Sequence, residues 1–206
     1  MNRLLRTGIA SMTLLLVQSH AHAQVENAAN TLLGQSSVFR TDQIGFFLAP
    51  GYDATRMDGS GASLFTLRGG ATFDDRFSLG AYVTTSVNEI RPRREVLPTV
   101  YMDYWSVGGF AEYTLFSSHV VHVTFPLKAG FGEVEMDDET VDRYLGESNF
   151  FQLKPSALLE LNLHENVRLT VGAGYRFVSQ MSYRTIDSSD ISGLTGSLAL
   201  KIGRFR

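Results

Sequence analysis

The sequence predicts an all-β protein, an eight-stranded antiparallel up-and-down barrel that crosses a membrane with its strands. Apolar residues alternate with polar or small residues along eight long segments, which is the period of a β-strand. Short polar turns alternate with longer loops between these segments. One register is apolar throughout, whereas the other carries charges and glycines. This distribution is expected of a barrel with lipid outside and side chains inside.

Length and composition limit the classes of protein to which the chain can belong. Its 206 residues suffice for one domain, 44% of them are hydrophobic, and there is no cysteine, which excludes disulfides and thiolate chemistry. The formal net charge of -3 argues against a nucleic-acid partner. The sequence has no glycine-rich phosphate loop, metal-ligand spacing or cofactor motif, so we expect no cofactor.

The start of the chain has the three parts of a secretory signal peptide. Two arginines precede an apolar stretch over residues 9–17, and the sequence AHA at 21–23 has the pattern of a cleavage site. The alternative, an N-terminal anchor helix, requires a longer apolar run. We therefore expect residues 1–23 to be removed and the mature protein to be exported.

The mature chain divides into two parts. Residues 24–42 show no alternation and are interpreted as an N-terminal leader, and residues 43–206 form the predicted barrel domain. The eight predicted strands are 43–54, 62–73, 77–89, 103–116, 120–133, 149–163, 167–177 and 193–204. Eight strands make a narrow barrel, whose interior is just wide enough for side chains to fill.

The connections between these strands fall into two sets. Three are tight polar turns, at 74–76, 117–119 and 164–166, and four longer connections follow the first, third, fifth and seventh strands. Because the two sets alternate, all short turns lie at one end of the barrel and all longer loops at the other. Short periplasmic turns and longer extracellular loops are typical of barrels in the bacterial outer membrane.

A soluble alternative has the same number of strands. In a lipocalin-like barrel the apolar register would point inward around a ligand. The lack of cysteine argues against this reading, and so does an opposite register with many glycines and few charges for a solvated exterior. These features favour a membrane barrel, which closes on itself because backbone polar groups cannot remain unpaired in hydrocarbon.

Six stretches carry a resemblance to a known family. They are IGFFLAPGYDA, FDDRFSLGAYV, YWSVGGFAEYTLF, FPLKAGFG, FFQLKPSALLELNLHENVRLTVGAGYRF and GSLALKIGRF. Together they resemble small outer-membrane β-barrel proteins in the style of outer membrane proteins A and X. The last stretch is similar to the C-terminal assembly signal of that family and closes on the aromatic Phe205, which Arg206 follows. The resemblance implies a monomer in the outer membrane, in contact with lipid and lipopolysaccharide, inserted by the barrel assembly machinery with periplasmic chaperones.

The inward register carries ionisable residues. Those expected to form a charge network near mid-strand are Arg68, Glu112, Lys128, Lys154 and Arg176. Others in the same register are His122, Glu160, Arg168 and Lys201. Charges in a narrow interior must pair, because an unpaired buried charge is very costly. We interpret the network as a salt-bridged plug, and the excess of basic residues leaves a narrow anion-preferring channel as the alternative.

Two of the longer loops are strongly charged. The acidic loop contains Asp137, Asp138, Glu139 and Asp142. It is either a solvated surface or a Ca²⁺ site, and its spacing does not match an EF-hand. The basic loop contains Arg91, Arg93 and Arg94. It either binds lipid phosphates at the outer leaflet or pairs with the acidic loop.

The pattern favours a structural or loop-display role over catalysis. Lipid-modifying barrel enzymes need a Ser/His/acid set or paired acids near one edge of the membrane. The serines and histidines at 117–119 and 164–165 lie in short polar turns, where such residues are common. We therefore expect no enzyme activity, and a lipid-modifying enzyme is the most distant alternative.

Overall fold

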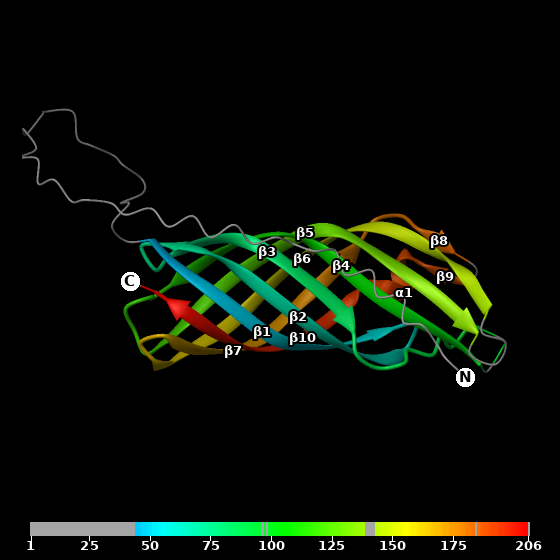
Figure 1. Ribbon diagram of the computed structural model, residues 1–206, viewed down its shortest axis with the longest axis horizontal. Coiled ribbons are helices and arrows are strands. Elements are labelled where there is room, and N and C mark those ends of the chain that lie inside the picture. Colours follow the sequence, from blue (N-terminus) through cyan, green and yellow to red (C-terminus); the bar gives the residue numbers. More distant parts are fainter. Residues whose placement is uncertain (1–43, 96, 98, 139–142, 184, 206) are drawn as a thin grey trace, which may run out of the picture. The chain divides into compact units, whose positions relative to one another are not determined.

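The computed structural model describes residues 44–95, 97, 99–138, 143–183 and 185–205. Eight strands form one closed antiparallel barrel, in which β1 pairs with both β2 and β10 (Figure 1). They are β1 (Ile44–Met57), β2 (Ser60–Phe73), β3 (Phe77–Ser86), β4 (Val100–Leu115), β5 (Val121–Asp138), β6 (Arg143–His164), β7 (Val167–Val178) and β10 (Gly193–Arg204). The predicted eight-stranded barrel is confirmed, while the predicted signal peptide and leader lie outside the described residues.

Three strands extend further toward the long-loop end than the sequence indicated. Strand β4 begins at Val100, β5 ends at Asp138 and β6 begins at Arg143. The predicted limits in these places were 103, 133 and 149. Strands β4 and β5 pair without interruption up to Val100 opposite Asp138, and a bulge between Met136 and Asp137 accommodates the pairing of β5 with β6. The extensions were missed because their alternation has the opposite polarity, as described below.

The connection between β1 and β2 is a tight turn, although the sequence analysis counted it among the longer loops. Asp58 and Gly59 have φ angles of 44° and 73°. Positive φ at both central residues is the signature of a two-residue hairpin turn, for which Asp-Gly is a preferred pair. The turn at the opposite end of β2 has the same character, with Asp74 and Asp75 at φ 52° and 54°.

The connection between β7 and β10 contains local structure that the sequence analysis did not predict. A two-residue hairpin pairs β8 (Ser182–Tyr183) with β9 (Ile186–Asp187), and the short helix α1 (Ser188–Ile191) follows. Asp187 caps α1 by accepting a hydrogen bond from the backbone N–H of Ser189. Figure 1 shows these elements at the long-loop end, opposite the end where β10 terminates. In the described part of the chain, no helix is long and apolar enough to cross a membrane.

The apolar register faces outward along the middle of the barrel. Phe46, Phe131 and Leu194 are 66%, 69% and 72% exposed, whereas Glu112 and Glu160 on the inner face are 1% and 0% exposed. A lipocalin-like arrangement would require the reverse. The soluble alternative is therefore wrong. Without a cover such as lipid, the outer surface would expose a large apolar area to water.

This polarity inverts near the long-loop end. On β5, Leu127 points outward and Lys128 is buried, but five residues further Glu133 points outward and Val134 is fully buried. Strand β4 shows the same change, because Asp103 is exposed beside the fully buried Met102. The long-loop end is therefore built like an ordinary soluble protein, with an apolar inside and a charged outside.

The interior has three zones along the barrel. Near the short-turn end, a small apolar cluster contains Phe47, Ala49, Phe110 and Phe205. The charged zone fills the middle. A larger apolar core closes the long-loop end, and its fully buried members include Met57, Ile90, Met102, Met136 and Ile191. Most of this core comes from loop residues and from the strand extensions.

Some inward glycines leave room for aromatic side chains as well as for the backbone of the neighbouring strand. A Cβ added to Gly80 would lie 2.8 Å from Cε1 of Phe110, and one added to Gly130 would lie 2.8 Å from the hydroxyl of Tyr82. The inward register therefore holds aromatic rings, such as those of Phe110 and Tyr82, as well as the expected ionisable side chains.

Candidate functional site

The charged interior is the candidate site, and Glu112 on β4 lies in the half nearer the short-turn end. Its carboxylate accepts hydrogen bonds from Arg68 Nη1 on β2 at 3.1 Å and from Lys201 Nζ on β10 at 2.6 Å. All three side chains are at least nine-tenths buried. Charge-assisted hydrogen bonds of this kind are the strong ones in proteins. Glu112 therefore links β4 with two strands that are not its neighbours in the sheet.

Glu160 on β6 extends this network toward the short-turn end. It contacts Lys201 Nζ at 2.8 Å, Arg168 Nη1 at 3.1 Å and His122 Nε2 at 2.9 Å. Arg168 in turn reaches Asp75 in the turn between β2 and β3, at 3.3 Å. One continuous chain of ion pairs therefore crosses the barrel from β2 to the short-turn end, and the interior holds a buried salt-bridge network.

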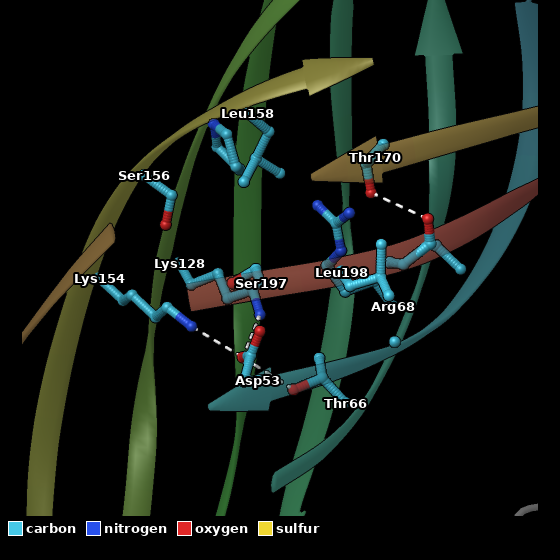
Figure 2. A pocket seen from close by; sticks show the side chains of 14 residues that line it. Asp53, Thr66, Arg68, Lys128, Lys154, Ser156, Leu158, Thr170, Ser197 and Leu198 are labelled. Carbon is cyan, nitrogen blue, oxygen red and sulfur yellow. Dashed lines mark hydrogen bonds and ion pairs between the residues drawn. The ribbon is translucent and has the colours of Figure 1, made fainter. Parts of the chain in front are cut away.

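A second cluster surrounds Asp53 on β1, closer to the long-loop end. Its Oδ2 atom accepts hydrogen bonds from Lys154 Nζ at 2.7 Å and from the Thr66 hydroxyl at 3.1 Å, and Lys128 Nζ lies 3.9 Å away. Figure 2 shows the two lysines and Thr66 converging on this carboxylate from different strands. A single oxygen atom therefore serves two lysines and one hydroxyl.

Asp53 was not among the residues expected in the network. It is 4% exposed and occupies the inward register of β1 beside the outward Tyr52. The alternation of the first predicted strand already placed it on that face. Because the predicted strand ends at residue 54, Asp53 lies at its edge, away from the mid-strand residues expected in the network.

The buried cations also lie over aromatic rings. Arg168 Cζ is 3.7 Å from the ring centroid of Phe205, and Lys201 Nζ is 4.7 Å from that of Phe47. Nearer the middle, Lys128 Nζ lies 5.2 Å from the ring of Tyr82. Such contacts stabilise a cation whose hydration has been removed. Tyr82, whose hydroxyl lies beside Gly130, thus also contributes to the charged zone.

Arg176 has a different role from the other four residues of the predicted network. Its Nε and Nη2 atoms donate hydrogen bonds to the backbone carbonyl of Ile191, at 2.9 and 2.7 Å, and its guanidinium lies 5.0 Å from the ring of Tyr104. Ile191 is the last residue of α1. Arg176 therefore anchors the helix of the long-loop end to the barrel wall, while Arg68, Glu112, Lys128 and Lys154 lie in the two ion clusters.

Phe205, the residue of the predicted assembly signal, lies inside the barrel. It is 3% exposed and belongs to the apolar cluster at the short-turn end, beneath Arg168. Ile202, three residues earlier, is 46% exposed on the outer face. The terminal aromatic residue therefore helps to close the short-turn end from within.

The described contacts of the basic loop include two aspartates from other parts of the long-loop end. Arg94 Nη1 lies 2.8 Å from Asp190 in α1, and the backbone N–H of Arg94 donates to Asp58 Oδ2 at 2.9 Å. The Ser60 hydroxyl donates to the backbone carbonyl of Arg91. The side chain of Arg93 lies close to Gly59 of the β1–β2 turn. These contacts hold the basic loop against α1 and the β1–β2 turn at the long-loop end.

The acidic loop is only partly within the described residues. Asp137 and Asp138 form the end of β5, whereas Glu139 and Asp142 lie outside the described residues. In the part of the chain that the structure describes, no group of three acidic or histidine side chains is arranged to hold a metal ion. The possible Ca²⁺ site therefore has no geometric support from Asp137 and Asp138.

The charged zone contains little free space. A cavity of about 20 Å³ lies beside Asp53, Arg68, Lys128 and Lys154, and another of about 10 Å³ touches Asp53 and the two lysines near Tyr82. Each has room for about one water molecule. Among the described residues of the charged zone, neither cavity is an open water-filled channel.

Comparisons with known proteins identify the fold. No protein-family model matches the sequence, and no curated protein matches it. Among solved structures, Neisserial surface protein A matches with a TM-score of 0.51 and 11% identity, over 80% of this chain and 97% of that chain. The outer membrane protein OprG from Pseudomonas aeruginosa matches with a TM-score of 0.51 and 10% identity, over 79% of this chain and 97% of that chain. The chain therefore has the fold of the small eight-stranded outer-membrane β-barrels.

Proposed function

We propose that this protein is an exported barrel of the bacterial outer membrane, closed to solute flow, which serves as a rigid platform for its long-loop end. The inversion of polarity along β4 and β5 is the observation that carries this proposal. Outward residues are apolar up to Trp105 and Phe131 and become acidic at Asp103 and Glu133. A strand that left a lipid layer and entered an aqueous phase would have this pattern.

The position of exposed aromatic residues agrees with such a boundary. Tyr52, Trp105 and Phe151 are 45%, 40% and 43% exposed, and all three lie just below the point of inversion. Aromatic residues are enriched at the borders of membrane barrels, where one end of the ring is apolar and the other is wet. Lipid would cover the barrel below this level, and the lipopolysaccharide head groups would surround the extensions of β4, β5 and β6.

The two ends and the middle each oppose passage of a solute. Phe205 and Phe47 fill the short-turn end, ion pairs fill the middle, and the apolar core fills the long-loop end. A display role makes use of a closed and rigid barrel. Arg91 and Arg93, which are exposed in the basic loop, are candidates for contact with phosphate groups of the outer leaflet.

Export through the signal peptide 1–23, insertion by the barrel assembly machinery with periplasmic chaperones, and a monomeric state complete the proposal. Phe205 would reach its buried place only once β10 closes against β1. Strand β10 would then be available to the barrel assembly machinery until it pairs with β1. A lipid-modifying activity has weak support, because both ring nitrogens of His122 face inner partners, Glu160 and the backbone carbonyl of His119.

Conductance in a planar bilayer tests closure, because the excess of inner basic residues favours an anion channel as the second candidate. We expect a silent bilayer after refolded protein has inserted, with insertion checked by the heat-dependent shift in gel mobility of a folded barrel. Discrete openings that prefer anions would refute the closed interior and would establish the channel instead.

A further inference from the structure

Lys128 is the least well paired cation of the charged zone. It is 6% exposed, and its nearest carboxylate oxygen, Asp53 Oδ2, is 3.9 Å away, beyond hydrogen-bonding distance. That oxygen already accepts hydrogen bonds from Lys154 and Thr66. Within the described residues, the ammonium group of Lys128 donates no hydrogen bond to a protein atom, and its other close neighbour is the ring of Tyr82. The Lys128 ammonium therefore has an ion-pair partner at 3.9 Å but no hydrogen-bond acceptor among the described residues, which is costly for a buried charge.

The whole inner face has an excess of positive charge. Its buried cations are Arg68, Lys128, Lys154, Arg168, Arg176 and Lys201. Its buried carboxylates are Asp53, Glu112 and Glu160. Asp75, at the short-turn end, compensates Arg168. The remaining imbalance falls toward the long-loop side, where Asp53 alone faces two lysines.

The cavity of about 20 Å³ lies at this place. Arg68, Lys128 and Lys154 line it, Asp53 contributes the only carboxylate among its described lining residues, and Ser156 adds a hydroxyl (Figure 2). A water molecule would fit and would offer Lys128 a hydrogen-bond acceptor, but it would leave the excess charge uncompensated. The space admits a particle of about the size of a water molecule, so a small ion is the charged ligand that it fits best.

We propose that this cavity holds one small monovalent anion of the size of chloride, bound to Lys128 as a permanent part of the folded barrel. The anion accepts a hydrogen bond from the Lys128 ammonium and compensates the charge that Asp53 leaves unbalanced. It lies between the apolar clusters at the two ends of the barrel, so we assign it a structural role and not one in transport. The proposal does not depend on the biological role of the barrel.

Refolding in different salts tests the proposal. The protein is refolded in detergent micelles in sodium chloride, sodium bromide or sodium gluconate at equal ionic strength, and its unfolding by urea is measured. Because chloride and bromide fit the cavity and gluconate does not, we expect the halides to stabilise the folded state. At a halide concentration of ten times the dissociation constant, linkage predicts an unfolding equilibrium constant about 11-fold lower than without halide.

Two variants separate this effect from general salt effects. Lys128→Met keeps a similar side-chain volume and removes the ammonium, so the difference between halide and gluconate should disappear. Arg76→Met removes one positive charge from an exposed turn residue and should retain the full difference. Equal stability of the unaltered protein in all three salts would overturn the proposal, as would a halide effect that persists in Lys128→Met.

Crystals of the unaltered protein, both refolded and grown in bromide, provide a direct readout, which also serves if Lys128→Met does not fold. We expect an anomalous bromide peak beside Lys128 Nζ, inside the barrel. An interior without a bromide peak would overturn the proposal.

Discussion

The middle of the barrel and its long-loop end are built from the same strands on opposite principles. In the middle, Lys128 and Glu112 lie inside and Leu127 lies outside. Along the extensions, Met136 lies inside and Glu135 outside. Side chains alternate between the two faces along the whole strand, but the apolar residues move from the outer to the inner register. On the proposed membrane placement, lipid would cover the apolar face in the middle and water the charged face beyond it.

This difference has a consequence for stability. The ions of the middle are held by specific geometry, and removal of one partner leaves another charge buried without compensation. The long-loop core is held by apolar contact, which depends on volume and tolerates substitution by side chains of similar size. Substitutions in the two regions should therefore differ both in magnitude and in their dependence on side-chain chemistry.

The largest effect is expected from loss of the central carboxylate. Glu112→Ala removes the carboxylate that lies 3.1 Å from Arg68 Nη1 and 2.6 Å from Lys201 Nζ. We expect the free energy of unfolding to fall by about 3–5 kcal/mol, the usual range for breaking a buried pair. Urea unfolding in detergent measures it, with the exposed Glu89→Ala as the control, which should change stability by less than about 0.5 kcal/mol. An unchanged unfolding transition for Glu112→Ala would show that the ion pairs do not hold the middle together.

A smaller effect is expected in the long-loop core. Met136 is fully buried there, and Met136→Ala should cost about 2–3 kcal/mol, in the lower half of the range for such truncations, because an end of the barrel can relax around a cavity. Met136→Leu keeps the volume and should cost less than about 1.5 kcal/mol. The same unfolding measurement compares the two variants. If Met136→Leu were as damaging as Met136→Ala, the core would depend on specific side chains as the middle does.

The sequence was sufficient to predict the features that alternation determines. The strands, their order and the inward position of Arg68, Glu112, Lys128 and Lys154 follow from a period of two, which assigns every side chain to a face once the direction is known. Neighbours across the barrel do not follow from alternation. The contact of Lys201 with Glu160 depends on the tilt and stagger of strands that pair with other partners.

The long-loop end could not be predicted in the same way. Ile90 and Ile191 come from loops, and their burial depends on contacts with the strand extensions rather than on local pattern. Glu135 and Glu147 are charged and lie on the outer face, so the extensions resemble polar loops when a single polarity is assumed for each strand. Arg176 shows the same limit, because its partner is a backbone carbonyl of a helix that no local signal in the sequence indicated.

The smallest expected effect concerns the acidic outer face of the extensions. Burial, followed by the charges of nearby carboxylates, of which Asp137 is the strongest, raises the pKa of Glu135. Asp103 and Glu147 stand directly opposite it on the neighbouring strands, an arrangement that destabilises a sheet. A raised pKa means that the folded protein binds this proton more tightly than the unfolded chain does, so stability is lost as pH rises from 4.5 through the folded pKa.

Glu135→Gln removes this loss and should stabilise the protein at neutral pH by about 0.2–0.5 kcal/mol at low salt, because exposed charges are strongly screened. Urea unfolding as a function of pH and salt measures the gain, which should vanish at low pH and in high salt, whereas a gain that persists at low pH would mean that repulsion is not its source.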